Sequence, residues 1–200
     1  MKKQKVEMPA HRTPARKQSP QKVRVLDAGD AEQQLASFIA RFSPEVASLA
    51  GEILLKMRQL CHTALELVYD NYNALAIGFG PTESASDAIF SIAVFPRWVS
   101  LFFLQAKGLP DPDKILKGSG TVARHVVLPS AETLNEPAVQ SLMREAKARA
   151  KVPFDAHGKH RLIIKSISPT QRPRRPSTSA VAPPKTKPTR QSRTVSARKK

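Results

Sequence analysis

The segment YDNYNALAIGFGPTESASDAIFSIAVFPRWVSLFFL, residues 69–104, decides the fold class of this 200-residue chain. It holds both tyrosines, the only tryptophan and five of the eight phenylalanines. Large and small side chains alternate from Ala74 to Phe79, which is the period of a β-strand. The runs Ala88–Phe95 and Trp98–Leu104 are apolar on both faces, and the short Pro96-Arg97 segment joins them. Three successive strands with short connections predict an antiparallel meander.

Helical periodicity precedes this segment. Asp30 can cap a first helix, whose apolar stripe is Leu35, Phe38, Ile39 and Phe42. Ser43-Pro44-Glu45 starts a second helix, because it combines a capping hydroxyl, a first-turn proline and an acid near the positive helix end. The stripe of this second helix keeps helical spacing from Val46 to Val68. We therefore expect one long helix that leads into the first strand.

Shorter elements follow the meander. We expect a helical turn at Lys114–Gly118, a short strand at Arg124–Leu128 and an edge strand at Arg161–Ile167. Asn135 can cap a helix between the last two strands, with Pro137 in its first turn. Because the strands follow one another instead of alternating with helices, the order predicts an α+β fold, with helices packed on one face of an antiparallel sheet.

The charge of the chain is concentrated at its two ends. The net charge is +6 for residues 1–29 and +10 for residues 169–200, but only +1 for residues 30–168. Both ends are rich in proline and lack aromatic residues, so we expect disordered basic tails around one domain, residues 30–168. Such tails can hold the phosphate backbone of nucleic acids without reading base sequence, or can serve only solubility. Both interpretations stay open.

A single cysteine, Cys61, excludes an internal disulfide and a multi-cysteine zinc site. We expect it to be a small core residue on the apolar side of the second helix. The basic residues near the start are not followed by an apolar run, and no stretch approaches the roughly 20 apolar residues of a spanning helix. We therefore expect a soluble cytoplasmic protein that does not contact membranes.

The segment 69–104, together with Gly118–Val126 and Leu162–Ser168, resembles the YdhG-like family of small bacterial domains. The resemblance covers about residues 35–175 and includes Gln171-Arg-Pro-Arg-Arg-Pro176. It implies a compact α+β domain. One branch of the family is described as frataxin-like iron chaperones, so the resemblance also implies iron as a candidate ligand. The family often has a lysine after the second glycine of Gly118-Ser-Gly120, where this chain has Thr121.

Three residues near the end of the second predicted helix form a candidate metal site. His62, Glu66 and Asp70 are spaced four apart and share one face if the helix persists that far. Imidazole and carboxylate groups suit iron or another divalent cation. A solvated helix end explains the same residues. His157 and His160 form a second, weaker candidate pair in a polar loop.

A candidate anion site lies around residues 118–125. Gly118 and Gly120 can let backbone amides approach an oxyanion, while Arg124 and His125 can supply positive charge. No Gly-Lys-Ser/Thr follows, which excludes a nucleotide P-loop. A glycine turn that enters a strand is the alternative interpretation.

Arg97 is the only Lys or Arg between residues 59 and 106, so the aromatic strands are expected to form core and not a nucleic-acid platform. Strands that are apolar on both faces need cover on both sides or a homodimer interface on one. Because no nucleophile can be placed against a base, we expect a binding module without catalysis. Its candidate ligands are iron or a small molecule; the alternative is a protein that binds nucleic acid through its tails.

Overall fold

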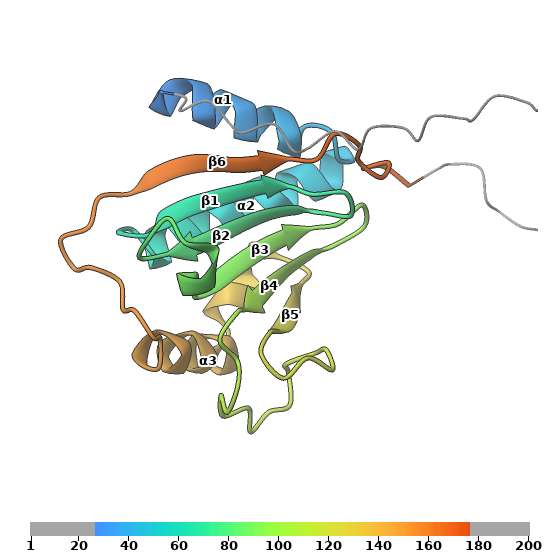
Figure 1. Ribbon diagram of the computed structural model, residues 1–200. Helices are drawn as coiled ribbons and strands as arrows, with labels where there is room; N and C mark the ends of the chain where they lie inside the picture. The colour runs from blue at the N-terminus through green and yellow to red at the C-terminus, as the bar shows by residue number, and fades with distance from the viewer. Residues whose placement is uncertain (1–26, 177–200) are drawn as a thin grey trace, which may run out of the picture.

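The computed structural model describes residues 27–176, which form three α-helices and one six-stranded sheet (Figure 1). The helices are α1 (Ala28–Ile39), α2 (Pro44–Leu60) and α3 (Pro137–Ala148), with short 3₁₀ turns η1 (Ala85–Asp87) and η2 (Ala131–Asn135). The strands are β1 (Leu65–Asp70), β2 (Leu75–Gly80), β3 (Phe90–Val94), β4 (Val99–Phe103), β5 (Arg124–Leu128) and β6 (Arg161–Ile167). The predicted disorder of residues 1–26 and 177–200 lies outside this range.

The predicted α+β class is confirmed. The strand order is β5-β4-β3-β2-β1-β6, and all neighbours are antiparallel except β1 and β6, which run parallel. The meander predicted within residues 69–104 is present as β2, β3 and β4. The last strand, β6, lies at a sheet edge as expected, but its parallel pairing with β1 was not predicted.

The prediction of one helix up to Val68 is wrong. Helix α2 ends at Leu60, the chain turns through residues 61–64, and residues 65–70 form strand β1. The sequence around β1 fits both periods. Leu60, Ala64 and Val68 are four residues apart, as on one face of a helix, whereas Glu66, Val68 and Asp70 are two apart, as on one face of a strand. Pairing on both sides, with β2 and β6, decides the competition in favour of the strand.

Three local predictions also need correction. Asp27, not Asp30, caps α1: its side chain accepts a hydrogen bond from the Asp30 amide at 2.9 Å. Asn135 ends η2 and does not cap α3, although Pro137 does occupy the first turn of that helix. The segment 114–118 is not helical, because Lys117 pairs with His125 in an isolated antiparallel bridge.

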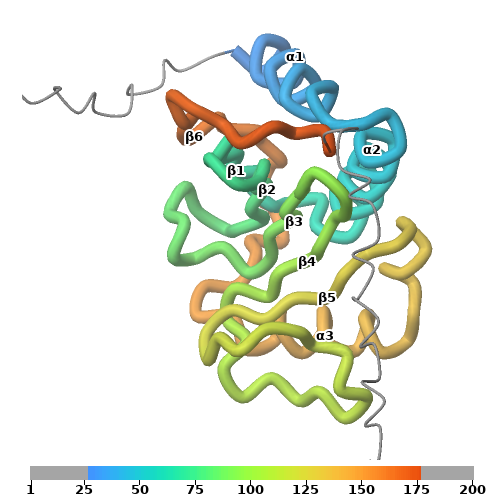
Figure 2. The backbone as a smooth tube through the Cα atoms, turned by 90° about the vertical axis from the view of Figure 1, so that its right-hand side faces the viewer, coloured from blue at the N-terminus to red at the C-terminus, as the bar shows by residue number. Residues whose placement is uncertain are grey.

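Helices α1 and α2 lie together over one face of the sheet, and α3 lies at the end of the molecule near β5 and packs into the same core (Figures 1 and 2). That face carries the large residues of the meander, which pack with α1, α2 and α3 into one core: Leu75, Ile77, Phe79, Phe90, Ile92, Val94, Val99, Leu101 and Phe103. The opposite face carries Ala76, Gly78, Ala93 and Ser100. Near Gly78 and Gly80 it is approached by Ala88, which directly follows η1 in the β2–β3 loop. A homodimer through this face stays a prediction.

Within residues 27–176, no helix has both the length and the apolar character needed to cross a membrane.

Cys61 lies in the core at the end of α2, as predicted, and is only 4% exposed. Burial raises the pKa of its thiol to about 11. We expect the native protein to react with an aromatic disulfide reagent at pH 8 much more slowly than the urea-unfolded protein, because little thiolate is present and access is blocked. Absorbance of the released thiolate measures the rate, and equal rates in both states would contradict the buried position.

Candidate functional site

The two acids of the predicted metal row lie on strand β1. Glu66 and Asp70 point to the helix-covered face, and both are almost completely buried. Because a strand rises about 3.3 Å per residue, four residues separate them by about 13 Å. His62 is exposed in the turn before the strand. The structure therefore does not bring the three predicted ligands together.

Glu66 is held by an arginine and a histidine. Its Oε1 and Oε2 accept hydrogen bonds from Arg58 of α2 at 2.7 and 2.8 Å, and Nε2 of His160 lies 2.8 Å from Oε1. Arg58 also pairs with Glu32 of α1 at 2.8 Å. The hydrogen bond to Glu66 is the main reason that the pKa of Arg58 lies above its ordinary value. This cluster joins both helices to the sheet.

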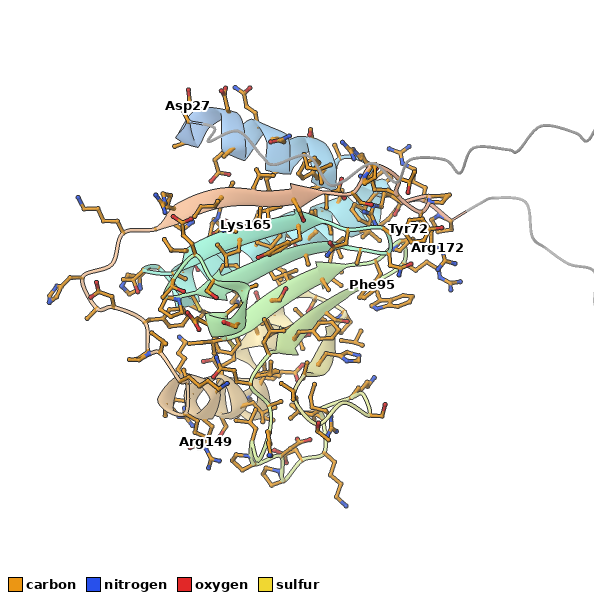
Figure 3. All side chains as sticks on the ribbon, in the orientation of Figure 1. Asp27, Tyr72, Phe95, Arg149, Lys165 and Arg172 are labelled. Atoms are coloured by element: carbon orange, nitrogen blue, oxygen red, sulfur yellow. The ribbon has the colours of Figure 1, made fainter. Side chains whose placement is uncertain are left out.

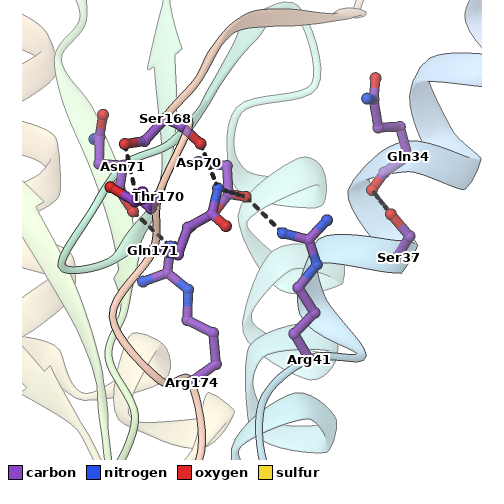
Figure 4. A network of polar contacts seen from close by, with 9 residues as sticks. All are labelled: Gln34, Ser37, Arg41, Asp70, Asn71, Ser168, Thr170, Gln171 and Arg174. Atoms are coloured by element: carbon purple, nitrogen blue, oxygen red, sulfur yellow. Dashed lines mark hydrogen bonds and ion pairs between the residues drawn. The ribbon is translucent and has the colours of Figure 1, made fainter. Parts of the chain in front are cut away.

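Asp70 is the centre of a second cluster, at the other end of β1 (Figure 4). Its Oδ2 accepts hydrogen bonds from Arg41 at 2.9 Å and from Gln171 at 3.0 Å, and its Oδ1 accepts one from Arg174 at 2.7 Å. The backbone oxygen of Asp70 accepts from the Ser168 amide at 2.8 Å. The side chain and the backbone of Asp70 therefore both fix the segment after β6.

Arg174 is a buried cation, with only 4% of its side chain exposed. Its Nη2 also donates to the Asn71 carbonyl at 2.5 Å, and its guanidinium lies 5.4 Å from the centroid of the Phe42 ring. Its Nε and Nη1 have no acceptor among the described residues. A buried charge of this kind is tolerated only when a counter-ion compensates its lost hydration, so Asp70 is what keeps Arg174 in place.

The residues predicted to bind metal do not fit that role. The carboxylate oxygens of Glu66 and Asp70 are occupied by positively charged or amide donors. His160 is committed to Glu66, so the predicted pair with His157 does not act as one ligand set. No group of three His, Cys, Asp or Glu residues in the described part of the chain is arranged to hold a metal ion.

The predicted anion site is also built differently. Arg124 donates to the carbonyls of Leu116 and Lys117, and the His125 ring stacks on Phe102 with centroids 4.8 Å apart. Gly118 has a φ of +101°, which favours glycine, and His125 lies over it. Arg124 and His125 therefore brace a glycine turn, in agreement with the alternative interpretation.

A groove lies beside the Asp70 cluster, between two hairpin tips and the segment 168–176, which we call the C-terminal strap. Strands β1, β3 and β6 point the same way, so the Asn73 tip, the Phe95–Trp98 tip and the strap all gather at one end of the sheet (Figure 3). The strap is attached to the first tip by the Arg172 amide, which donates to the Tyr72 carbonyl at 2.8 Å. The groove has a volume of about 680 Å³.

The groove combines positive charge with aromatic and proline surfaces. Arg97 lies on one wall, and Arg172 and Arg175 lie on the other. The rings of Phe95 and Trp98 are stacked, with centroids 5.0 Å apart and an interplanar angle of 24°. The remaining lining residues are Asn73, Pro96, Pro173 and Pro176, so no acidic side chain offsets the arginines. Such a site is complementary to an anion that also carries flat or apolar surface.

Sequence reasoning missed this groove for a specific reason. The Lys or Arg that precedes Arg97 in the sequence is almost 40 residues away, and Arg172 of the strap follows Arg97 by 75 residues. No local cluster of basic residues therefore marks the groove around Arg97. The sequence places residues 169–176 in the C-terminal tail, but Arg174 is buried and these residues pack on the domain. The dense Arg172-Pro-Arg-Arg-Pro176 motif, directly before the basic end of the chain, is the signal that was available.

The chain was compared with protein-family models, with curated proteins and with solved structures, and none of them matches it. Membership of the YdhG-like family therefore stays a prediction.

Removal of the Asp70 carboxylate is expected to destabilise the protein strongly. Asp70→Ala leaves Arg174 buried without its counter-ion, which costs about 3–5 kcal/mol. Urea unfolding followed by circular dichroism measures the loss. In the matched control Glu83→Gln, which breaks the exposed pair with Arg161, the loss stays below about 1 kcal/mol. A change at Asp70 no larger than the control would contradict the structural role of the cluster.

The pH dependence of stability should include a contribution from His125. Burial, together with the charges of Lys117 and Arg124, lowers the pKa of His125 below its ordinary value. Protonation is therefore harder in the folded state, so this contribution is present above pH 6.5 and is lost as the pH falls through the lowered pKa. We expect His125→Gln to lose less stability than wild type between pH 7.5 and pH 5 in urea unfolding. An unchanged pH profile for His125→Gln would refute the assignment.

Proposed function

We propose that this protein binds nucleic acid, with the groove between the hairpin tips and the C-terminal strap as its ordered phosphate-binding site. The observation that carries the proposal is the convergence of Arg97, Arg172 and Arg175, all exposed, on a groove without an acidic lining residue. Guanidinium groups can bind phosphate oxygens through two parallel hydrogen bonds, which makes arginine well suited to this ligand.

The charge distribution along the chain supports the same function. Residues 30–168 carry a net charge of +1, whereas the strap adds three arginines and no acid. The described part of the chain ends at Pro176, in the groove, and seven Lys and Arg residues follow within residues 177–200. The basic C-terminal segment therefore begins at the proposed phosphate site, so a polyanion bound in the groove can also be held by this segment.

Iron or small-molecule binding was the other function expected from the sequence. The predicted iron ligands are separated or already paired, so the described residues give iron no comparable site. A phosphate-containing ligand fits the charge of the groove better than a cation does.

Trp98 is the only tryptophan and lines the groove, so its fluorescence can report binding there. We expect addition of an oligonucleotide to change this fluorescence, with an affinity that falls steeply as salt increases. The double variant Arg97→Gln/Arg172→Gln should weaken binding and reduce the slope of log affinity against log salt by about 1.4–1.8, the contribution of two phosphate contacts.

A matched variant controls for the loss of overall charge. Lys107→Gln/Arg144→Gln removes two exposed positive charges, one after β4 and one on α3, neither of which lines the groove. This variant should keep nearly the wild-type slope. An equal loss in both double variants would show that only total charge matters and would reject the groove as the binding site.

A further inference from the structure

The Trp98 ring is an exposed aromatic surface held in one orientation. It is 39% exposed, whereas the next residue, Val99, is fully buried in the core. Phe95 supports the ring by stacking, and its amide donates to the Trp98 carbonyl at 2.9 Å, which closes the tight turn. An exposed tryptophan that is fixed in this way loses little conformational entropy when a second flat group stacks on it.

We infer that the groove selects single-stranded nucleic acid, by stacking one unpaired base on Trp98 while the arginines hold the flanking phosphates. This inference rests on the proposed function and names its substrate class. Within a duplex, neighbouring base pairs cover the faces of each base. Only an unstacked base can present its face to a side chain, and stacking of this kind accepts any base.

The positions of the arginines agree with a base between two phosphates. The Arg97 guanidinium lies 6.0 Å from the centroid of the Trp98 ring, at the outer limit of a cation–π contact. On the other wall, Nε and Nη2 of Arg175 donate to the carbonyls of Phe42 and Ala40, which fixes the side chain and leaves Nη1 out of these two bonds. Positive charge is therefore available beside the aromatic ring, from Arg97, and elsewhere in the groove lining, from Arg175.

The size and shape of the groove favour the same ligand. A volume of about 680 Å³ lies within the range of pockets that hold one small organic ligand, such as the base and sugar of a nucleotide. The prolines of the strap and of the β3–β4 tip form its apolar walls. Their fixed backbone angles favour a preformed groove over one that must close on the ligand.

The test compares three fluorescein-labelled ligands on the full-length protein by anisotropy: oligo(dT), an abasic strand of equal length, and a blunt-ended duplex without a loop. We expect wild type to bind oligo(dT) more tightly than the other two at the same salt. Trp98→Ala should weaken oligo(dT) binding by roughly 5- to 150-fold, the range for losing one base–aromatic stack, and leave the abasic strand nearly unchanged. Trp98→Phe should recover most of the loss.

Further variants and ligands separate the possible failures. Tyr72→Ala removes an aromatic residue that is 54% exposed on the neighbouring tip but does not line the groove, and should bind like wild type.

Equal binding of all three ligands, with dependence on the groove arginines intact, would overturn the single-strand inference and keep the proposed function. Loss of that arginine dependence would reject the proposed function itself. Displacement of oligo(dT) by an equal concentration of poly-glutamate would also overturn the inference in favour of an acidic peptide.

Discussion

The buried carboxylate of Asp70 holds one end of the molecule together. It lies on β1, next to the edge strand β6, and binds three side chains from two places in the chain: Arg41 after α1, and Gln171 and Arg174 in the C-terminal strap. An ion pair of this kind adds little net stability when complete, but leaves an uncompensated buried charge when broken. Any arrangement of the strap that separates Arg174 from Asp70 would leave a buried charge without its counter-ion, so this pair disfavours such arrangements.

The observed arrangement of the strap shapes the groove. Arg174 points inward to Asp70 and Phe42, while its neighbours in the sequence, Pro173 and Arg175, line the groove on the outside. Between Arg172 and Pro176, Arg174 alone is buried, so this one inward contact holds the groove-lining residues on either side of it. The interior ion pair and the exposed, arginine-lined groove are thus coupled, although Asp70 does not line the groove.

Structural features that depend on neighbouring residues were predictable, whereas those that depend on distant segments were not. The meander was predictable, because the alternation from Ala74 to Phe79 and the tight Pro96-Arg97 connection are features of neighbouring residues. The error at β1 arose because its apolar residues satisfy both helical and strand periods, and pairing with β6, almost 100 residues away, decided between them. That error also converted Glu66 and Asp70 from two separate ion-pair centres into an apparent metal site.

The sequence by itself determined the α+β class, the meander and the charge of the two ends, because periodicity and composition act over short stretches of chain. Only the tertiary structure decided which side chains meet. The parallel pairing of β6 with β1 carries the strap to the end of the sheet where Arg97 and Trp98 lie. The aromatic segment that begins at Tyr69 supplies core residues of the sheet, as predicted. Beside its exposed tip, however, Arg172 of the strap adds positive charge, 75 positions after Arg97. Contacts between distant segments depend on strand order and direction, which local patterns do not specify.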